Sequence, residues 1–282
     1  RMLTDASIEG GFAVCGVSGG VDSAVAAVLA HQAFGERMTA IYVETGLMRE
    51  GESAAVQETF ERLGIPLRVA DRAESVLAGL REKQTMREKR EVVVACLHEE
   101  MIRQTEAIPG AKTLVMGTNY SDFLGGANNA VWQDCGMAVL EPLALLFREE
   151  VRAIAETLGM DSSIVQRKPF PLMGLGARII GEVTPEKLAA LRKADAIFSG
   201  EIREAGLNKK LYKYFPIMVD AQKETSTIIL RAVTISGAML VPARLPYDLV
   251  ERTVERILET TPTVRRVFYD QTPTPIGKET FQ

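Results

Sequence analysis

Short apolar runs alternate with longer segments of helical periodicity along the first half of the chain. The apolar runs predict strands at residues 12–17, 38–43, 67–70 and 113–116. The segments between them predict helices at residues 21–34 and 52–63 and a charged helical stretch at residues 74–105. Strands that alternate with helices indicate a doubly wound parallel sheet of the α/β class, with helices on both faces. In such sheets ligands bind beyond the carboxyl ends of the strands.

The second half of the chain has a different order of elements. Glu141 to Gly159 predicts a helix, and Thr184 followed by Pro185 marks the start of another, with Thr184 as its N-cap. Two strands, a helix and a further strand are then predicted at residues 215–219, 227–235, 247–259 and 265–269. The sequence therefore predicts an α/β domain over residues 1–165 and a smaller α+β domain over residues 166–282.

Composition and charge narrow the class of protein. The 282 residues carry a net charge of −4 with a pI of about 5.5, so no basic surface indicates a nucleic-acid partner. No apolar run reaches the length of about 18 residues that a membrane-spanning helix needs, and the N-terminus lacks the pattern of a signal peptide. Three cysteines in a chain of this size argue against a disulfide scaffold and favour a reducing, cytoplasmic location.

The segment between the first predicted strand and the first predicted helix has the chemistry of an anion-binding loop. It reads Val-Ser-Gly-Gly-Val-Asp-Ser at residues 17–23. Gly19 and Gly20 permit a tight turn that brings backbone N–H groups close to a ligand, and the following helix directs its positive end to the same place. Asp22 can hold a magnesium ion among phosphate oxygens. The loop is shorter than a Walker-type P-loop and lacks its lysine.

The order Ser-Gly-Gly-x-Asp-Ser resembles the loop of ATP pyrophosphatases of the PP-loop type. Those enzymes hold the pyrophosphate leaving group of ATP while AMP passes to a substrate oxygen. The resemblance implies ATP and Mg²⁺ as cofactors, with Asp22 as the catalytic and metal-binding residue. The phosphate-binding residues that it implies are Ser18, Gly19, Gly20, Val21, Asp22 and Ser23. Residues 44–46 and 117–119 follow two other strands of the same predicted sheet, so we expect them to converge on this loop.

Further segments narrow the resemblance within the PP-loop group. Tyr-Val-Glu-Thr-Gly-Leu-Met-Arg at residues 42–49 is similar to a strand end of GMP synthetases. Residues 169–183 and 192–197 are similar to the segment of that family that begins with Pro-Phe-Pro, and residues 230–233 and 266–270 to its C-terminal domain. The resemblance to the GMP synthetase (GMP synthase) family implies an ATP pyrophosphatase domain followed by a dimerisation domain that helps to bind a purine nucleotide. It therefore also implies a homodimer.

The same resemblance assigns roles to individual residues. Val43 and Gly117 are implied to contact the adenine and ribose of ATP, and Asp122 matches an aspartate of the family. The residues implied to bind the purine nucleotide are Arg167, Arg178, Lys278 and Thr280. An arginine fork suits a phosphate group, but a structural salt bridge is the alternative role for Arg178.

The chain departs from the family on the side of the site that receives AMP. The family carries a Lys-Ser-His-His-Asn segment after its Tyr-Pro-Asp sequence, whereas residues 123–138 here contain no histidine and no lysine. The C-terminal lysine is displaced to Lys278, and a Pro-Gly-Pro-Gly turn has become Pro-Leu-Met-Gly at residues 171–174. A site that keeps its ATP half and changes its acceptor half suggests a different purine or a different nucleophile.

Two cysteines are candidates for a sulfur nucleophile, because other PP-loop enzymes place sulfur on an adenylated carbonyl through a cysteine persulfide. Cys96 follows the basic residues Arg87, Lys89 and Arg90, whose charges can lower the pKa of its thiol. Core packing is the alternative for Cys96, since it shares an apolar helix face with its neighbours. Cys135 is the second candidate, within the changed segment.

Three functions follow from these observations. The sequence favours an enzyme that adenylates GMP with ATP and then installs sulfur, which resembles the GMP-thiolating enzymes of 6-thioguanine pathways and implies a cysteine desulfurase as partner. The alternative is a GMP synthetase subunit that aminates XMP with ammonia from a separate glutamine amidotransferase, because we expect no amidotransferase domain in this chain. The third is a regulatory nucleotide-binding homodimer without catalysis, which the retained Asp22 and loop serines argue against.

Overall fold

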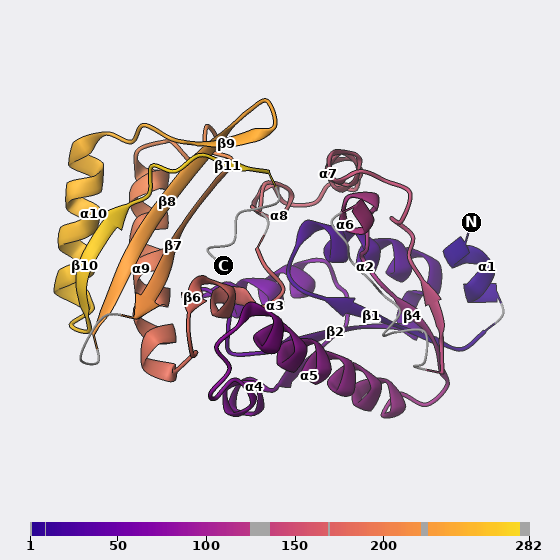
Figure 1. Cartoon of the computed structure of the whole chain (residues 1–282). Helices are drawn as coiled ribbons and strands as arrows, with labels where there is room; N and C mark the ends of the chain where they lie inside the picture. Colours follow the sequence, from indigo (N-terminus) through magenta and orange to yellow (C-terminus); the bar gives the residue numbers. More distant parts are fainter. Residues whose placement is uncertain (1, 9, 125–135, 169, 221–224, 277–282) are drawn as a thin grey trace. The chain divides into compact units, whose positions relative to one another are not determined.

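The computed structural model describes residues 2–8, 10–124, 136–168, 170–220 and 225–276 (Figure 1). The chain divides into two compact units. Unit 1 consists of Arg1–Thr45, Gly51–Ala73 and Val93–Leu172, and unit 2 of Gly46–Glu50, Glu74–Val92 and Met173–Gln282. The predicted domain boundary between residues 165 and 166 stays a prediction.

Unit 1 is built on a five-stranded sheet in the order β3-β2-β1-β4-β5, and all of its neighbouring strands are parallel. Its strands are β1 Phe12–Val17, β2 Met38–Glu44, β3 Leu67–Asp71, β4 Ala111–Val115 and β5 Ala138–Leu140. The chain runs outward from β1 to β3 and then returns to β4 on the other side of β1. The predicted doubly wound sheet is therefore confirmed, with its switch point between β1 and β4.

Helices cover both faces of this sheet. The helices with residues in unit 1 are α1 Met2–Ile8, α2 Val21–Phe34, α3 Glu52–Arg62, α5 Met86–Glu106, α6 Tyr120–Leu124, α7 Arg148–Thr157 and α8 Ser162–Val165. On one face, α2 packs on the sheet through small side chains such as Ala24 and Ala27, and α7 joins the same core through Val151. On the other face, Met101 of α5 packs with Val14. Small residues on α2 allow the helix to approach β1 closely, which fixes where the loop before it lies.

Two predicted helices differ from the observed ones. The charged stretch at residues 74–105 is two helices, α4 Ala73–Gly79 and α5, because Thr85 begins α5 with a capping box. Thr85 donates its N–H to Glu88 Oε2 at 2.9 Å, and Glu88 donates its N–H to Thr85 Oγ1 at 3.3 Å. The helix predicted from Glu141 begins only at Arg148, where the N–H of the preceding Phe147 donates to Glu150 Oε2 at 2.7 Å.

Unit 2 contains a mainly antiparallel sheet with two long helices packed on it (Figure 1). Its strands are β6 Ile179–Ile180, β7 Lys213–Asp220, β8 Ser226–Ser236, β9 Met239–Pro242, β10 Val264–Tyr269 and β11 Thr274–Pro275, and its long helices are α9 Pro185–Glu204 and α10 Tyr247–Thr260. Thr184 caps α9 as predicted, since its Oγ1 accepts from the N–H of Lys187 at 3.3 Å. The predicted strand–strand–helix–strand order is confirmed, and the short strands β6, β9 and β11 were not predicted.

Two segments from the first half of the chain belong to unit 2. Arg192 of α9 holds the first, Gly46–Glu50, because its Nη2 donates to the carbonyl of Gly46 at 2.7 Å. In the second, Glu74–Val92, the buried Lys89 donates from Nζ to the carbonyl of Ile179 at 2.6 Å, and burial lowers the pKa of this lysine to about 8. The chain therefore passes between the two units several times before it reaches α9.

No helix within the described residues combines the length and apolar character that crossing a membrane requires.

Candidate nucleotide-binding site

The predicted anion loop joins β1 to α2 at the switch point of the unit 1 sheet. Ser23 closes the loop: its Oγ accepts from the N–H of Ser18 at 3.1 Å and donates to the carbonyl of Gly20 at 3.1 Å. Gly20 is the N-cap of α2 and makes no side-chain cap. The first N–H groups of α2 are therefore available to an anion, at the positive end of the helix dipole.

Gly19 has a backbone conformation that favours glycine and too little space around it for a side chain. Its φ is +80°, and a Cβ at this position would lie 2.5 Å from Val56 Cγ2 and 3.0 Å from Arg167 Nη1. The Arg167 guanidinium donates from Nη1 to the carbonyl oxygen of Gly19. Arg167 therefore braces the phosphate loop, and its implied contact with the purine nucleotide stays a prediction.

Gly117 brings the end of β4 into direct contact with the start of α2. A Cβ on Gly117 would lie 2.6 Å from Ser23 Cα and 2.7 Å from Ser23 N. The two segments that flank the switch point are thus packed backbone to backbone, as the convergence expected for residues 117–119 requires. Because nothing larger than glycine fits here, the close approach is part of how the loop is built.

Asp22, in the first turn of α2, lies in a polar cluster with Asn119, Asp122 and Arg148. Asn119 donates its N–H to Asp122 Oδ2 at 3.1 Å, and Asp122 pairs with Arg148 Nη2 at 3.0 Å. Burial raises the pKa of Asp22, Arg148 lowers it, and the carboxylate of Asp122 raises it further. The buried Oδ1 of Asp22 and the buried Nδ2 of Asn119 have no hydrogen-bond partner among the described residues. A buried carboxylate oxygen and a buried amide nitrogen without partners indicate a place for a ligand.

The donors present fit a magnesium ion that a nucleotide brings with it. Mg²⁺ is usually bound through one or two carboxylates, water and substrate phosphates, and Asp22 Oδ1 offers one such carboxylate oxygen beside the loop. Within the described residues no group of three or more acidic, histidine or cysteine side chains could hold a metal alone. Phosphate oxygens and water would therefore supply most of the ligands.

Val43, the residue implied to contact adenine, has its side chain in the core. It is only 8% exposed and packs in a cluster with Ile41 of the same strand and Leu114 of β4. Any contact of Val43 with a nucleotide therefore uses its main chain, at the carboxyl edge of β2. Its assignment to the adenine site stays a prediction.

The structure places Arg178 in a buried ion pair of unit 2. Its Nη1 lies 2.6 Å from Asp195 Oδ1, and its guanidinium carbon lies 4.8 Å from the centre of the Phe215 ring. Arg49 shares the same carboxylate, with Nε 3.1 Å from Asp195 Oδ2. The structural salt bridge that the sequence left open is therefore present, while a contact of Arg178 with the purine stays a prediction. The predicted residues Cys135, Lys278 and Thr280 lie outside the described residues.

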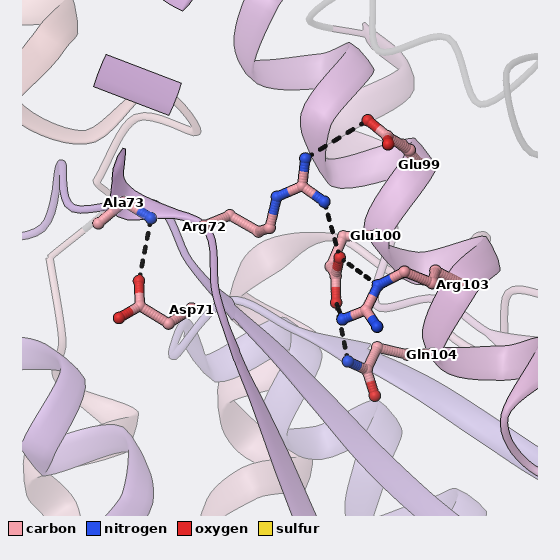
Figure 2. A network of polar contacts seen from close by, with 7 residues as sticks. All are labelled: Asp71, Arg72, Ala73, Glu99, Glu100, Arg103 and Gln104. Atoms are coloured by element: carbon pink, nitrogen blue, oxygen red, sulfur yellow. Dashed lines mark hydrogen bonds and ion pairs between the residues drawn. The ribbon is translucent and has the colours of Figure 1, made fainter. Parts of the chain in front are cut away.

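A charged network links α5 to the residue that follows β3 (Figure 2). Cys96 lies close enough to this network for the charges of Arg72 and Glu100 to act on its thiol. Arg72 donates from Nη1 to Glu100 Oε2 at 3.0 Å, and Arg103 donates from Nη2 to Glu100 Oε1 at 2.5 Å. Cys96 is 8% exposed, and burial raises the pKa of its thiol more than Arg72 lowers it. The thiol is therefore protonated at neutral pH, which disfavours it as a nucleophile.

We expect Glu100→Gln to make unfolding less sensitive to acid. The fully buried Glu100 carboxylate accepts from Arg103, Gln104 and Arg72, and these bonds outweigh burial to lower its pKa from 4.5 to about 2. A folded-state pKa below the unfolded one stabilises the protein above about pH 4.5, and this contribution is lost as the pH falls toward 2. Urea unfolding between pH 7 and pH 3 would test it: the variant should be less stable at pH 7 and lose less stability on acidification. Parallel pH profiles for the two proteins would contradict the assignment.

Sequence reasoning missed the two arginines of α7, Arg148 and Arg152. Both lie close enough to Asp22 to lower its pKa. The signal available was their spacing of four residues, which places them on the same side of a helix. That spacing alone gave no indication that the helix would pack against α2.

A loop of this kind, at the switch point of a parallel sheet and with an acid in the first helical turn, defines the PP-loop class of ATP pyrophosphatases. The family model for NAD synthase, which belongs to this class, matches residues 5–175.

Proteins that are similar over almost the whole chain identify a family within this class. GMP synthase [glutamine-hydrolyzing] of Symbiobacterium thermophilum is 40% identical over 296 residues, which cover 96% of this chain and 57% of that protein. A GMP synthase [glutamine-hydrolyzing] subunit from Methanocaldococcus jannaschii is 39% identical over 282 residues, which cover 93% of this chain and 90% of that protein. The chain belongs to the GMP synthase family, and it spans little more than half the length of the Symbiobacterium relative.

Proposed function

We propose that this protein uses ATP and Mg²⁺ to aminate XMP to GMP, with release of AMP and pyrophosphate. The observation that carries the proposal is the similarity to the GMP synthase subunit from Methanocaldococcus jannaschii, which extends over 90% of that relative, together with an intact phosphate loop in this chain. The sequence favoured sulfur transfer, with amination of XMP as the alternative. The similarity to GMP synthases favours amination.

The chemistry requires two substitutions. A carbonyl oxygen of the purine attacks the α-phosphorus of ATP, so that the bond to the β-phosphate oxygen breaks and pyrophosphate leaves. Ammonia then adds to the activated carbon and loses a proton, and the carbon–oxygen bond breaks to release AMP. The protein contributes mainly position and charge compensation.

Each part of the described site has a role in the first substitution. The N–H groups at the start of α2 bind the phosphates, and the turn at Gly19 brings the backbone close enough to do so. Mg²⁺ held by Asp22 would neutralise charge on the departing pyrophosphate. Arg167 keeps the loop in its binding conformation through the Gly19 carbonyl.

Transfer of sulfur to GMP gains no support from these observations. The relatives named above are GMP synthases, and the thiol of Cys96 is buried with its pKa raised. Cys135 lies outside the described residues, so its suitability stays open to direct test.

The proposal predicts that the protein with ATP, Mg²⁺, XMP and ammonium forms GMP, AMP and pyrophosphate in equal amounts. Ammonium is supplied directly, so the result does not depend on a glutamine-hydrolysing partner. Cys96→Ala should leave the rate within about twofold, since a buried, protonated thiol has no role in amination. Chromatography and mass spectrometry of the nucleotides measure all three products.

Other outcomes separate the alternatives. One such outcome is that the unaltered protein converts GMP to a thionucleotide when sulfide is supplied, while Cys96→Ala or Cys135→Ala does not. This result would contradict the proposal and favour sulfur transfer. No AMP with either purine nucleotide would favour the regulatory alternative. We infer that a glutamine amidotransferase supplies the ammonia in the cell, because the relatives are named as glutamine-hydrolysing. The homodimer and the cytoplasmic location stay predictions.

A further inference from the structure

One arginine beside the phosphate loop has no counter-charge of its own within the part of the chain that the structure describes. Arg148 and Arg152 lie one turn apart on α7, which packs against α2 through Val151 and Ala155. Arg148 is paired with Asp122 at 3.0 Å. Arg152 makes neither a hydrogen bond nor an ion pair with any described residue, and its Nε is buried. A half-buried guanidinium left in this state is costly unless a ligand completes it.

No carboxylate among the described residues forms an ion pair with Arg152, although several charged side chains lie around it. The cationic side chains that gather around the loop and its neighbours are Arg148, Arg152, Arg167 and Lys168. The carboxylates among them are Asp22, Asp122, Glu44 and Glu52, and Asp122 is already bound by Arg148. Arg152 lies near both Asp22 and Lys168, because its charge lowers the pKa of each. For Lys168, burial is the larger cause of the lowered pKa. Arg152 is therefore unpaired among the described residues although these four cations and four carboxylates balance in number.

The unpartnered amide of Asn119 indicates the same thing independently. Asn119 is fully buried, and its side-chain oxygen accepts from the N–H of Asp122 at 3.2 Å, so its Nδ2 is a donor without an acceptor among the described residues. It faces the Asp22 carboxyl and lowers the pKa of that group as a donor would, although the geometry between them falls short of a hydrogen bond. Two unsatisfied donors, a guanidinium and an amide, thus lie beside the positive end of a helix. An anion with several oxygen atoms would satisfy both.

We propose that Arg152 binds the pyrophosphate end of the nucleotide and holds it as the bond to the α-phosphorus breaks. The identity of the nucleotide rests on the proposed function, but the binding of pyrophosphate does not. A guanidinium presents two parallel N–H groups to a phosphate, and its position on a packed helix fixes the direction from which it binds. Arg167, by contrast, is engaged by the loop itself through the Gly19 carbonyl.

Titration calorimetry with Mg²⁺ and inorganic pyrophosphate tests this on the full chain. We expect Arg152→Gln, which keeps a polar side chain but removes the charge, to weaken binding by about tenfold or more. Arg152→Lys should recover part of the loss. Arg62→Gln is the matched control, because Arg62 is an exposed arginine of the same unit, 57% exposed and 3.6 Å from Asp161, and should leave binding unchanged.

The outcomes separate this inference from the proposed function. Equal binding by Arg152→Gln and the unaltered protein would overturn the inference, as would a failure of the unaltered protein to bind pyrophosphate. If binding depends on Arg152 but XMP is not aminated, the inference stands and the proposed function fails. Circular dichroism of each variant shows that it is folded, and Arg152→Lys serves as the folded comparison should Arg152→Gln unfold.

Discussion

Asp22→Asn should reduce the formation of AMP from ATP by at least about 100-fold while leaving the protein as stable as before, or more stable. The carboxylate is the only candidate that the sequence assigned to magnesium, and its buried Oδ1 has no partner in the described part of the protein. The activity should fall because an amide does not compensate the charge of a metal bound to pyrophosphate. The stability should not fall, because burial raises the pKa of Asp22 and its ionised form therefore destabilises the fold at neutral pH.

The sign follows from the direction of the shift. A folded-state pKa above the unfolded one means that stability decreases as the pH rises between the two values, and asparagine removes this dependence. Asp161→Asn is the matched control, since this exposed carboxylate is 3.6 Å from Arg62 and should affect neither quantity appreciably. AMP release and thermal unfolding measure the two effects. Undiminished AMP release by Asp22→Asn would refute the assignment of a PP-loop enzyme.

Gly117→Ala should destabilise unit 1 by about 3 kcal/mol and abolish nucleotide binding. The new Cβ would lie 2.6 Å from Ser23 Cα and 2.9 Å from the carbonyl carbon of Asp22. Both are backbone atoms at the start of a packed helix, so neither can rotate away as a flexible side chain could. The start of α2 must therefore move, and the phosphate-binding N–H groups move with it. Urea unfolding and nucleotide titration measure the two losses.

Gly20→Ala is the control within the same loop. Its φ is −77°, and a Cβ there would lie 3.5 Å from Ser18 Oγ, which is an ordinary contact. We expect its cost in stability to stay within about 1 kcal/mol. Equal stability of Gly117→Ala and Gly20→Ala would show that β4 and α2 are not packed as described.

The parts of the fold that depend on neighbouring residues could be predicted from the sequence. The strand at 12–17, the helix at 21–34 and the Thr184 N-cap were all correct, because apolar periodicity and capping act over a few residues. The break between α4 and α5 was missed although Thr85 and Glu88 form a recognisable capping box. The prediction treated the charged residues on both sides of the break as one helical stretch and gave this cap no weight.

The ion pairs and pKa shifts of the site residues could not be predicted, because they depend on contacts between residues that are far apart in the sequence. The pairing of Arg178 with Asp195 was one of two roles left open, and only packing shows it. The raised pKa of Cys96 follows from burial within unit 1, whereas the sequence drew attention to the basic residues before it. Arg152 received no role from the sequence, because its place beside the loop depends on the packing of α7 against α2.

The repeated passage of the chain between the units limits how this protein can have changed during evolution. Gly46–Glu50 and Glu74–Val92 belong to unit 2 but are encoded within the first third of the chain. Hydrogen bonds with Arg192 and Ile179, which come later in the sequence, hold the two segments in unit 2. A single genetic crossover could not exchange unit 2 for that of another enzyme without leaving both segments mismatched. New acceptor specificity in this family is therefore expected to arise by substitution and loop replacement rather than by shuffling of whole domains.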